Sequence, residues 1–586
     1  MTRADYDPDG IESPYHVDRK RFRWYINSGY MTRRFRWYFQ YCDSIHPMIF
    51  NTAQKGGNIM IKKCIFGVTV VLLLFGLGFT PGVDAAERKD VLVLGMATSD
   101  IISLDPAKAF EFSGVGIINQ LYDKLLDFPA GRFDKPELSL AESWKVSDDG
   151  IVWKFKLKKG IKFHSGNEVT AEDVAYSFKR VVYLKDQPAF ILTQFGLTED
   201  SIKVVDEYTV QITLDKQYAQ GIFFSCLSAG VASIVDSKVV KQHEQKTDKY
   251  PNGDRGMTWL SRNSAGSGPF VLNKWEKNDR VILDANAKHF VHPPKVKRVV
   301  IKEIVEATSR RLQVEKGDID VAWEMFPDQV KELEKNTDIQ IARIAALQIW
   351  YVGMNVSKGP LADAKVRKAI RYAIDYDGII NDIMAGAGVQ TNTFIPKGFA
   401  GYEDKIIYRT NLEKAKALLK EAGYPDGFET SMDHGDQTPY PAVAQVIQNS
   451  LSRVGIKVKL NKLVSAQLWP KYRAQKHELI LARWGPDYID PHTNAQPFAD
   501  YKAKQLCWRN VFYNDKTSGL IQKAGVEMNN DKRIKLYQEA NTIIQEEGPY
   551  AFLFQPLYQH AVRKNLENFY AAPTFSLWKL YSVGKK

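Results

Sequence analysis

The sequence lacks the short motifs that mark the common enzyme classes. Its 586 residues contain only four Cys, and there is no CxxC, HExxH, GxSxG or GxxxxGK segment. The usual sequence evidence for thiol redox chemistry, zinc-dependent hydrolysis, a serine nucleophile and nucleotide binding is therefore missing. An enzymatic role is therefore unsupported by any motif, although a scattered active site leaves no such motif, and we predict no catalytic residues, no metal site and no cofactor.

Histidine pairs with metal-binding spacing are also scarce. His289 and His292 lie three residues apart, but Pro293 and Pro294 follow at once. Because proline breaks a helix, the two rings are not expected to share a helical face. We predict that both are exposed residues of a surface loop.

Clusters of charge of one sign are absent from the main part of the chain. Residues 86–586 carry 69 Lys and Arg against 61 Asp and Glu, and the lysines are scattered. A scattered basic excess of about +8 is typical of a solvated surface, so we predict no nucleic-acid partner. Two cysteines, Cys226 and Cys507, remain in this part, and their wide separation gives no reason to pair them.

Only one stretch is apolar enough to enter a membrane. Lys62 and Lys63 precede an apolar run of about 16 residues, which ends at Pro81 and is followed by small residues up to Ala85. The run is short for a membrane span and matches a secretory signal. We predict a signal peptide at 60–85, cleavage after Ala85 and a soluble protein outside the cytoplasm. Because no Cys follows the run, a lipoprotein anchor is not indicated.

Residues 1–59 precede this signal, which is expected at the start of a secreted protein. They repeat the sequence RFRWY at 21–25 and 34–38. Alternating basic and aromatic residues could bind nucleic acid or a membrane surface. We favour the interpretation that translation starts at Met60 and that 1–59 is a non-native upstream extension without a stable fold.

The pattern of apolar residues predicts a β-rich part followed by an α/β part. Residues 91–95 read as a buried strand, and apolar residues alternate with lysines over 151–157, as in an antiparallel sheet with one solvated face. Thr170 and Asp173 form a capping box at a helix start. From about Trp350, helices alternate with apolar strands, which is typical of an α/β lobe. Residues 550–562 return to strands, so one lobe is expected to be inserted within another.

One stretch, 479–491 (LILARWGPDYIDP), combines a short apolar strand with a turn that carries Trp484, Asp487 and Asp490. An aromatic ring and a carboxylate at the end of a strand suit a cationic, partly apolar ligand. The alternative is that both acids only build the turn, as Asp before Pro often does.

Several further short motifs occur together along the chain. They are LAESW at 140–144, residues 153–160 with Phe163-His164, TAEDVAYSF at 170–178, GPF at 268–270, Asn355 with Pro360-Leu361, VRKAI at 366–370, and 414–423. Together they resemble the periplasmic peptide-binding proteins of ABC importers, extracellular solute-binding proteins that include dipeptide- and oligopeptide-binding members. The resemblance covers residues 88–586.

This resemblance implies an α/β, two-lobed venus-flytrap fold with the ligand between the lobes. Lobe I would comprise 88–345 and 553–586, with an extra subdomain at about 125–263. Lobe II would comprise 346–552. The chain would cross between lobes near Trp350 and Phe554.

The resemblance also implies ligand-binding residues. Segment 484–491 matches the pattern W-x-x-D-x-x-D-P, in which Asp487 would bind the α-ammonium group of a peptide and Trp484 would pack on the ligand. Further candidates are Tyr440, Tyr488, Ser99, Asp100 and Ile101.

One position departs from the dipeptide-binding pattern. Those relatives carry an Arg for the ligand carboxylate shortly before a Pro-Tyr pair, and Thr438 stands there in this chain. Either Arg483 or a group of lobe I holds the carboxylate, or the ligand is longer or is not a peptide. Opine-type conjugates, glutathione and haem are the non-peptide alternatives.

The resemblance implies a monomeric periplasmic receptor that captures peptides and delivers them to a permease pair with a cytoplasmic ATPase. The alternative from another class is a secreted hydrolase, and a third is a nutrient sensor that docks a chemoreceptor.

Overall fold

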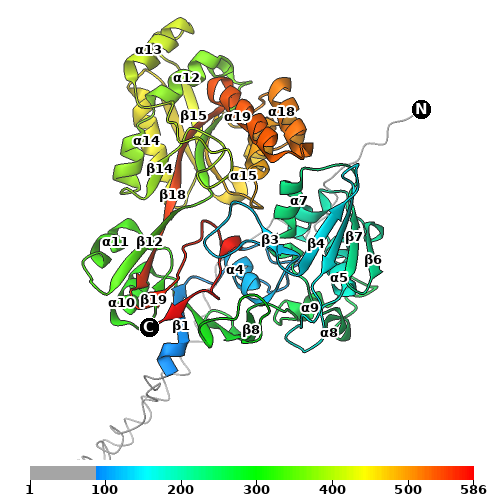
Figure 1. Cartoon of the computed structure of the whole chain (residues 1–586). Coiled ribbons are helices and arrows are strands. Elements are labelled where there is room, and N and C mark those ends of the chain that lie inside the picture. The colour runs from blue at the N-terminus through cyan, green and yellow to red at the C-terminus, as the bar shows by residue number, and fades with distance from the viewer. Residues whose placement is uncertain (1–86) are drawn as a thin grey trace, which may run out of the picture. The chain divides into compact units, whose positions relative to one another are not determined.

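The computed structural model describes residues 87–586, which are organised around one long mixed β-sheet (Figure 1). The segments predicted as an upstream extension (1–59) and a signal peptide (60–85) lie outside the described residues. In spatial order the main strands are β16 (Lys457–Leu463), β15 (Glu429–Gly435), β17 (Leu479–Trp484), β13 (Ile349–Met354), β18 (Tyr550–Arg563), β11 (Val321–Ala322), β1 (Val91–Met96), β10 (Arg298–Glu303), β9 (Arg280–Ala285) and β8 (Phe270–Glu276).

Each half of this sheet contains parallel pairs, whereas the strands around its middle and those at the β8 edge are antiparallel. β1 is parallel to β10 and β11, and β15 is parallel to β16 and β17. β18 is antiparallel to every strand that it pairs with, including β12 (Ile339–Ala345) and β14 (Gly388–Gln390). Parallel pairs need crossover connections, and these connections place helices against both halves of the sheet.

Strand β18 belongs to both halves of the sheet. Its first part pairs with β13 and β14 as far as Pro556, and its second part pairs with β12 from Leu557 onward. In Figure 1 it runs from the group of elements around α12–α14 to the group around β12 and β19 (Leu566–Glu567). This change of partners supports, as a proposal, the division into lobe I (88–345 and 553–586) and lobe II (346–552).

A separate four-stranded antiparallel sheet lies within residues 125–263. Its order is β4 (Ala141–Val146), β5 (Val152–Leu157), β7 (Thr209–Thr213) and β6 (Ile202–Asp206). Trp153, Phe155 and Leu157 of β5 are buried while the lysines between them are exposed, as the alternation predicts. The capping box of Thr170 and Asp173 is also present.

Helices cover both parts of the long sheet. Those of eight residues or more in the described chain are α4 (Phe112–Leu121), α5 (Ala171–Leu184), α7 (Gln220–Leu227), α10 (Ala307–Lys316), α12 (Ala364–Ala373), α13 (Leu412–Glu421), α14 (Tyr440–Ser452), α15 (Ser465–Arg473), α16 (His492–Ala499), α18 (Asp515–Val526) and α19 (Asn530–Glu547). Across residues 87–586, none of the helices has the length and apolarity that a membrane crossing needs.

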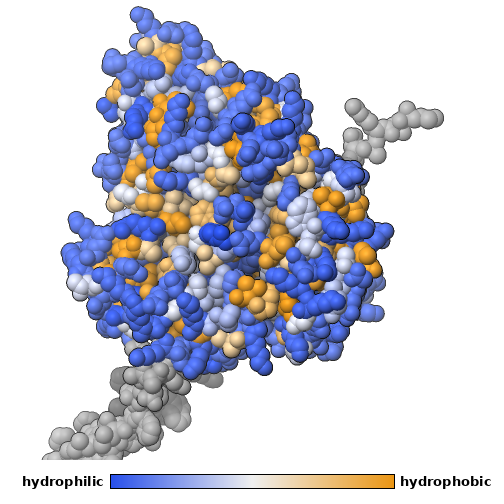
Figure 2. All heavy atoms as spheres, viewed as in Figure 1, coloured by the Kyte–Doolittle hydropathy of each residue, from blue (hydrophilic) through white to orange (hydrophobic). Residues whose placement is uncertain are grey.

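The apolar core follows the same division. One cluster of buried residues lies within the 125–263 part and its surroundings, a second surrounds α12 and α14, and a third spans strands of both halves. On the face shown in Figure 2, hydrophilic residues cover the outer elements, and apolar residues gather along the middle, where β18 passes between the halves. Cys226 and Cys507 are buried free thiols, and burial raises the pKa of each.

The start of β18 is fixed by a buried arginine of α12. Arg371 donates from Nε to the carbonyl of Tyr550 (2.8 Å), from Nη1 to that of Glu546 (3.1 Å), and from Nη2 to that of Gly548. These carbonyls include the last ones of α19, which have no partner within the helix. The guanidinium therefore joins the end of α19 to the strand that both halves share.

Replacing Arg371 tests whether its hydrogen bonds between α19 and β18 stabilise the fold. Arg371→Met keeps the length of the side chain but leaves three buried carbonyls without a donor, so the free energy of unfolding should fall by about 2–4 kcal/mol. Urea unfolding followed by circular dichroism measures this. Lys365→Met, at an exposed position of the same helix, is the matched control and should cost little. Equal stability of the two variants would contradict the role given to Arg371.

Candidate functional site

Two adjoining cavities lie between the halves of the structure. They contain about 950 and 1010 Å³ of empty space, including the solvent at their mouths. Such volumes suit a small-molecule ligand. Both are lined by Phe112 of α4, Gln348, Arg483 of β17, Tyr558 of β18 and Phe575, so they form one continuous inter-lobe cleft.

The loop after β17 forms one wall of this cleft. Gly485, Pro486 and Asp487 line it directly. The loop is held from behind by Thr493 of α16, whose carbonyl accepts a hydrogen bond from Trp484 Nε1 (3.2 Å) and whose hydroxyl accepts one from the Asp487 amide (3.1 Å). The backbone of Asp487 is therefore fixed while its side chain faces the cleft.

The second acid of the loop has a structural role. Asp490 is buried and forms an ion pair with Arg533 of α19, with both N–O distances at 2.8 Å. Its Oδ1 also accepts a hydrogen bond from the amide of His492 (2.9 Å). The alternative that the acids build the turn thus applies to Asp490.

Unlike Asp490, Asp487 has a carboxylate without a cationic partner among the described residues. No hydrogen bond or ion pair to its carboxylate is found within residues 87–586. Burial raises the pKa of Asp487 from about 3.8 to about 6, because removal from water penalises the charged form. A partly buried carboxylate without a cation is a strong candidate for binding a ligand cation.

Arg483 is the cation of the cleft. It lines both cavities, and its guanidinium has no ion-pair or hydrogen-bond partner among the described residues. Successive side chains of a strand point to opposite faces of the sheet, so Arg483 and the next residue of β17, Trp484, point in opposite directions. Arg483 faces the cleft, so Trp484 faces the core, where it packs against the buried cluster. The structure does not bring Trp484 to the cavity wall.

The other predicted residues lie near the cleft without lining it. Tyr440 is buried at the start of α14, and the centre of its ring lies 4.5 Å from that of Trp350. Tyr488 is buried in the cluster that contains Cys226. Ile101 is buried, and Asp100 accepts a hydrogen bond from the Ser113 amide (3.1 Å).

Ser99 is exposed and does not line either cavity. Of the eight predicted residues, Asp487 and Arg483 are therefore the two that the structure brings together at the cleft.

Sequence reasoning missed an acid of lobe I. Glu324 follows β11 and lines the cleft beside Arg483 and Tyr558. Burial among the cleft walls raises the pKa of Glu324, with Arg310 and Arg483 opposing the effect. A signal was present in the sequence: Trp323-Glu324 at the end of an apolar strand resembles the arrangement around Trp484 and Asp487.

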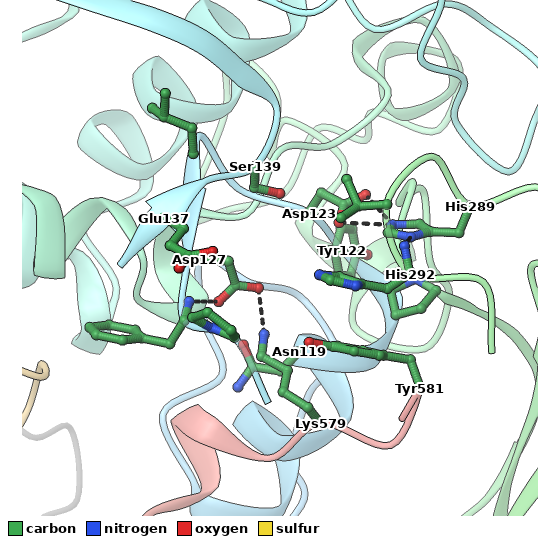
Figure 3. Close-up of a pocket in the computed structure, with 15 residues that line it drawn as sticks. Asn119, Tyr122, Asp123, Asp127, Glu137, Ser139, His289, His292, Lys579 and Tyr581 are labelled. Carbon is green, nitrogen blue, oxygen red and sulfur yellow. Dashed lines mark hydrogen bonds and ion pairs between the residues drawn. The ribbon is translucent and has the colours of Figure 1, made fainter. Parts of the chain in front are cut away.

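A further cavity has the opposite character (Figure 3). Its acids all have partners: Asp123 is 3.1 Å from His289 Nε2, Asp127 binds Lys579, and Glu137 binds Arg132. Carboxylates paired in this way stabilise the fold, and they leave no unpaired charge of their own to bind a ligand.

The prediction that both histidines are exposed is wrong for His289, which is 6% exposed. The ring of His289 is held in the interior by its contact with Asp123. The ring of His292 stacks on that of Tyr581, with 4.2 Å between the ring centres. The described residues contain no group of three or more His, Cys, Asp or Glu that could hold a metal ion.

The cleft contains three unpaired charges, two acidic and one basic, amid apolar walls. These residues offer no arrangement of nucleophile and base, and they suit the binding of a zwitterionic molecule.

Comparison with known proteins gives a consistent result. The family described as bacterial extracellular solute-binding proteins, family 5 (middle), matches residues 135–505. A probable D,D-dipeptide-binding periplasmic protein of Escherichia coli K12 is 32% identical over 520 residues, which cover 88% of this chain and 98% of that protein.

Other relatives carry different ligand names. Heme-binding protein A of Haemophilus influenzae is 30% identical over 460 residues, covering 74% of this chain and 81% of that protein. The structure of a periplasmic binding protein from Helicobacter pylori in complex with the peptide STSA has a TM-score of 0.67 and 27% identity, covering 85% of this chain and 99% of that one.

The two acids of the loop predict opposite effects of the same substitution. The raised pKa of Asp487 means that its ionisation destabilises the folded, ligand-free protein; the cost is absent below about pH 3.8 and complete above about pH 6. Asp487→Asn should therefore raise the free energy of unfolding by about 1–3 kcal/mol at neutral pH, and the gain should shrink as pH falls toward 4.

Asp490→Asn is the matched comparison, because it removes the partner of a buried guanidinium and should cost about 3–5 kcal/mol. Urea titrations of ligand-free protein at about pH 8 and pH 4.5 measure both. A destabilising effect of Asp487→Asn at neutral pH would show that the carboxylate has a stabilising partner.

Proposed function

Because the chain belongs to the bacterial extracellular solute-binding proteins of family 5, we propose that it is the periplasmic receptor of an ABC importer for short peptides. This family consists of binding proteins rather than enzymes and has the two-lobed periplasmic binding protein fold. The observation that carries the proposal is the unpaired carboxylate of Asp487, facing a cleft between the lobes.

The proposed ligand contacts follow from the charges of the cleft. Asp487 binds the α-ammonium group, since a buried ammonium needs a paired carboxylate. Arg483 binds the ligand carboxylate in place of the arginine that Thr438 replaces, because a guanidinium holds a carboxylate with two hydrogen bonds. Trp484 supports the loop from the core side.

Capture would proceed by closure of the lobes around the ligand, with bending near the two chain crossings. The closed, loaded form would be delivered to a membrane permease pair with a cytoplasmic ATPase. We propose a monomer that is exported through the signal peptide 60–85 and is not a lipoprotein.

The names of relatives favour peptides but include other ligands. The relative with 32% identity is named as a dipeptide-binding protein, and the one with 30% identity is named as a heme-binding protein.

Ligand identity is therefore tested directly. Isothermal titration calorimetry measures the binding of L-Ala-L-Ala, D-Ala-D-Ala, glutathione and haemin, and native mass spectrometry identifies any ligand retained by protein from rich medium. Stoichiometric binding of either dipeptide without product supports the proposal. Binding of haemin or glutathione alone would overturn peptide capture, and release of free alanine would favour a hydrolase.

Removing the ammonium anchor should weaken binding strongly. Asp487→Ala should reduce the affinity for Ala-Ala by about 2–5 kcal/mol, because the ligand ammonium is left unpaired. Far-UV circular dichroism should show an unchanged fold. Unaltered affinity would contradict the assignment of Asp487.

Binding should also depend on pH. A ligand ammonium needs Asp487 in its charged form, and with a pKa of about 6 only about a tenth is charged near pH 5. The Kd for Ala-Ala should therefore rise about tenfold between about pH 7.5 and pH 5. Asp487→Asn should bind weakly at both pH values and abolish this dependence.

The carboxylate anchor has its own test. Arg483→Met keeps an apolar stem at the cleft but removes the charge, so Ala-Ala should bind about tenfold or more weakly. Alanyl-alaninamide, which lacks the carboxylate, should bind the wild type and this variant equally. A variant that loses affinity for both ligands to the same degree would show that Arg483 acts on the fold of the cleft instead.

A further inference from the structure

Glu324 is the third unpaired charge of the cleft, and it comes from the opposite lobe to Asp487 and Arg483. It lines the cavity together with Arg483. Its side chain is exposed to the water of the cleft, while the surrounding protein raises its pKa by desolvation. No ion pair or hydrogen bond to its carboxylate occurs within residues 87–586.

The backbone at Glu324 is held firmly in an unusual conformation. Its φ angle is 48°, a left-handed value that is uncommon for residues other than glycine. Its amide donates to His560 Nδ1 (3.1 Å) and its carbonyl accepts from Arg310 Nη2 (3.1 Å). Such local strain is typical of functional positions.

The nearby arginine of lobe I forms no ion pair with this carboxylate, although its charge opposes the rise in the pKa of Glu324. The guanidinium of Arg310 is occupied by the carbonyls of Ile304, Val305 and Glu324 itself. The carboxylate of Glu324 therefore remains available to a cation that enters the cleft.

The walls around Glu324 are apolar. Phe112, Met325, Phe326 and Met384 line the same cavity. An apolar passage that ends at an acid matches a long basic side chain, whose methylene stem is apolar and whose tip is charged.

The three charges occur in the order acid, base, acid. Asp487 and Arg483 share one cavity, and Arg483 and Glu324 share the next. In a dipeptide with a basic second residue, an ammonium lies on one side of the carboxylate and a cationic side chain branches from the carbon that bears it.

Building on the proposed function, we propose that Glu324 forms a cation subsite and that the preferred cargo is a dipeptide whose second residue is Lys or Arg. Asp487 then binds the α-ammonium, Arg483 the carboxylate and Glu324 the side-chain cation. The ligand would thus contact charges of both lobes at once.

The test compares three dipeptides of the same length in the stereochemical series that binds Ala-Ala. They are Ala-Lys, its isomer Lys-Ala, and Ala-norleucine, which keeps the stem of lysine and lacks its charge. Calorimetry should give a Kd for Ala-Lys at least about tenfold below that of the other two. Glu324→Gln should remove this advantage, so that Ala-Lys and Ala-norleucine bind with similar Kd values, and an unchanged far-UV circular dichroism spectrum controls for folding.

Equal binding of Ala-Lys and Ala-norleucine by the wild type would overturn the subsite, as would an unchanged ratio in Glu324→Gln. In either case, binding of Ala-norleucine that still depends on Asp487 would leave the proposed function intact. If none of the three dipeptides binds, both the subsite and peptide capture are overturned.

Discussion

The backbone hydrogen bonds of β18 constrain the whole structure, because one continuous strand supplies edges to both halves of the sheet. Its partners change between Pro556 and Leu557, where β14 ends its pairing and β12 begins. A relative movement of the halves must bend the chain at this point or break ladder bonds on one side. The cleft opens beside the same strand, since Tyr558 lines both of its cavities. Movement and binding are therefore coupled through one stretch of backbone.

The contrast between neutralised and unneutralised charges separates structure from binding in this protein. Asp490 and Arg533 are both buried and satisfy each other, so they fix the loop. Asp487, three residues away, has its backbone held by Thr493 and its carboxylate left free. Burial of a free charge reduces stability, and natural proteins retain such costs mainly at functional sites. The same criterion sets the cavity of Figure 3 apart, because its acids are paired.

The sequence was sufficient to predict local structure and to single out Asp487 in the cleft, and insufficient where tertiary contacts decide. The alternation of apolar residues located β5, and the capping-box motif located the start of α5, since both signals depend only on residues close in the sequence. Family motifs located Asp487, but they also implied that Trp484 packs on the ligand, whereas the structure turns its side chain toward the core. The burial of His289 depends on Asp123, 166 residues away, which no local pattern reveals. The pair Trp323-Glu324 gave only a weak local signal, and the fold was needed to show that Glu324 lines the cleft.

The placement of the free charges on different lobes has a consequence for selectivity. A ligand shifts the equilibrium between open and closed forms only by the difference in its affinity for the two. A molecule that satisfies Asp487 alone contacts lobe II equally in both forms and gains little from closure. A molecule that also reaches Glu324 gains an ion pair only when the lobes approach, so it favours the closed form. Under the proposed function, the closed form would therefore be populated mainly when a ligand pairs with all three charges, and the permease would receive loaded receptor.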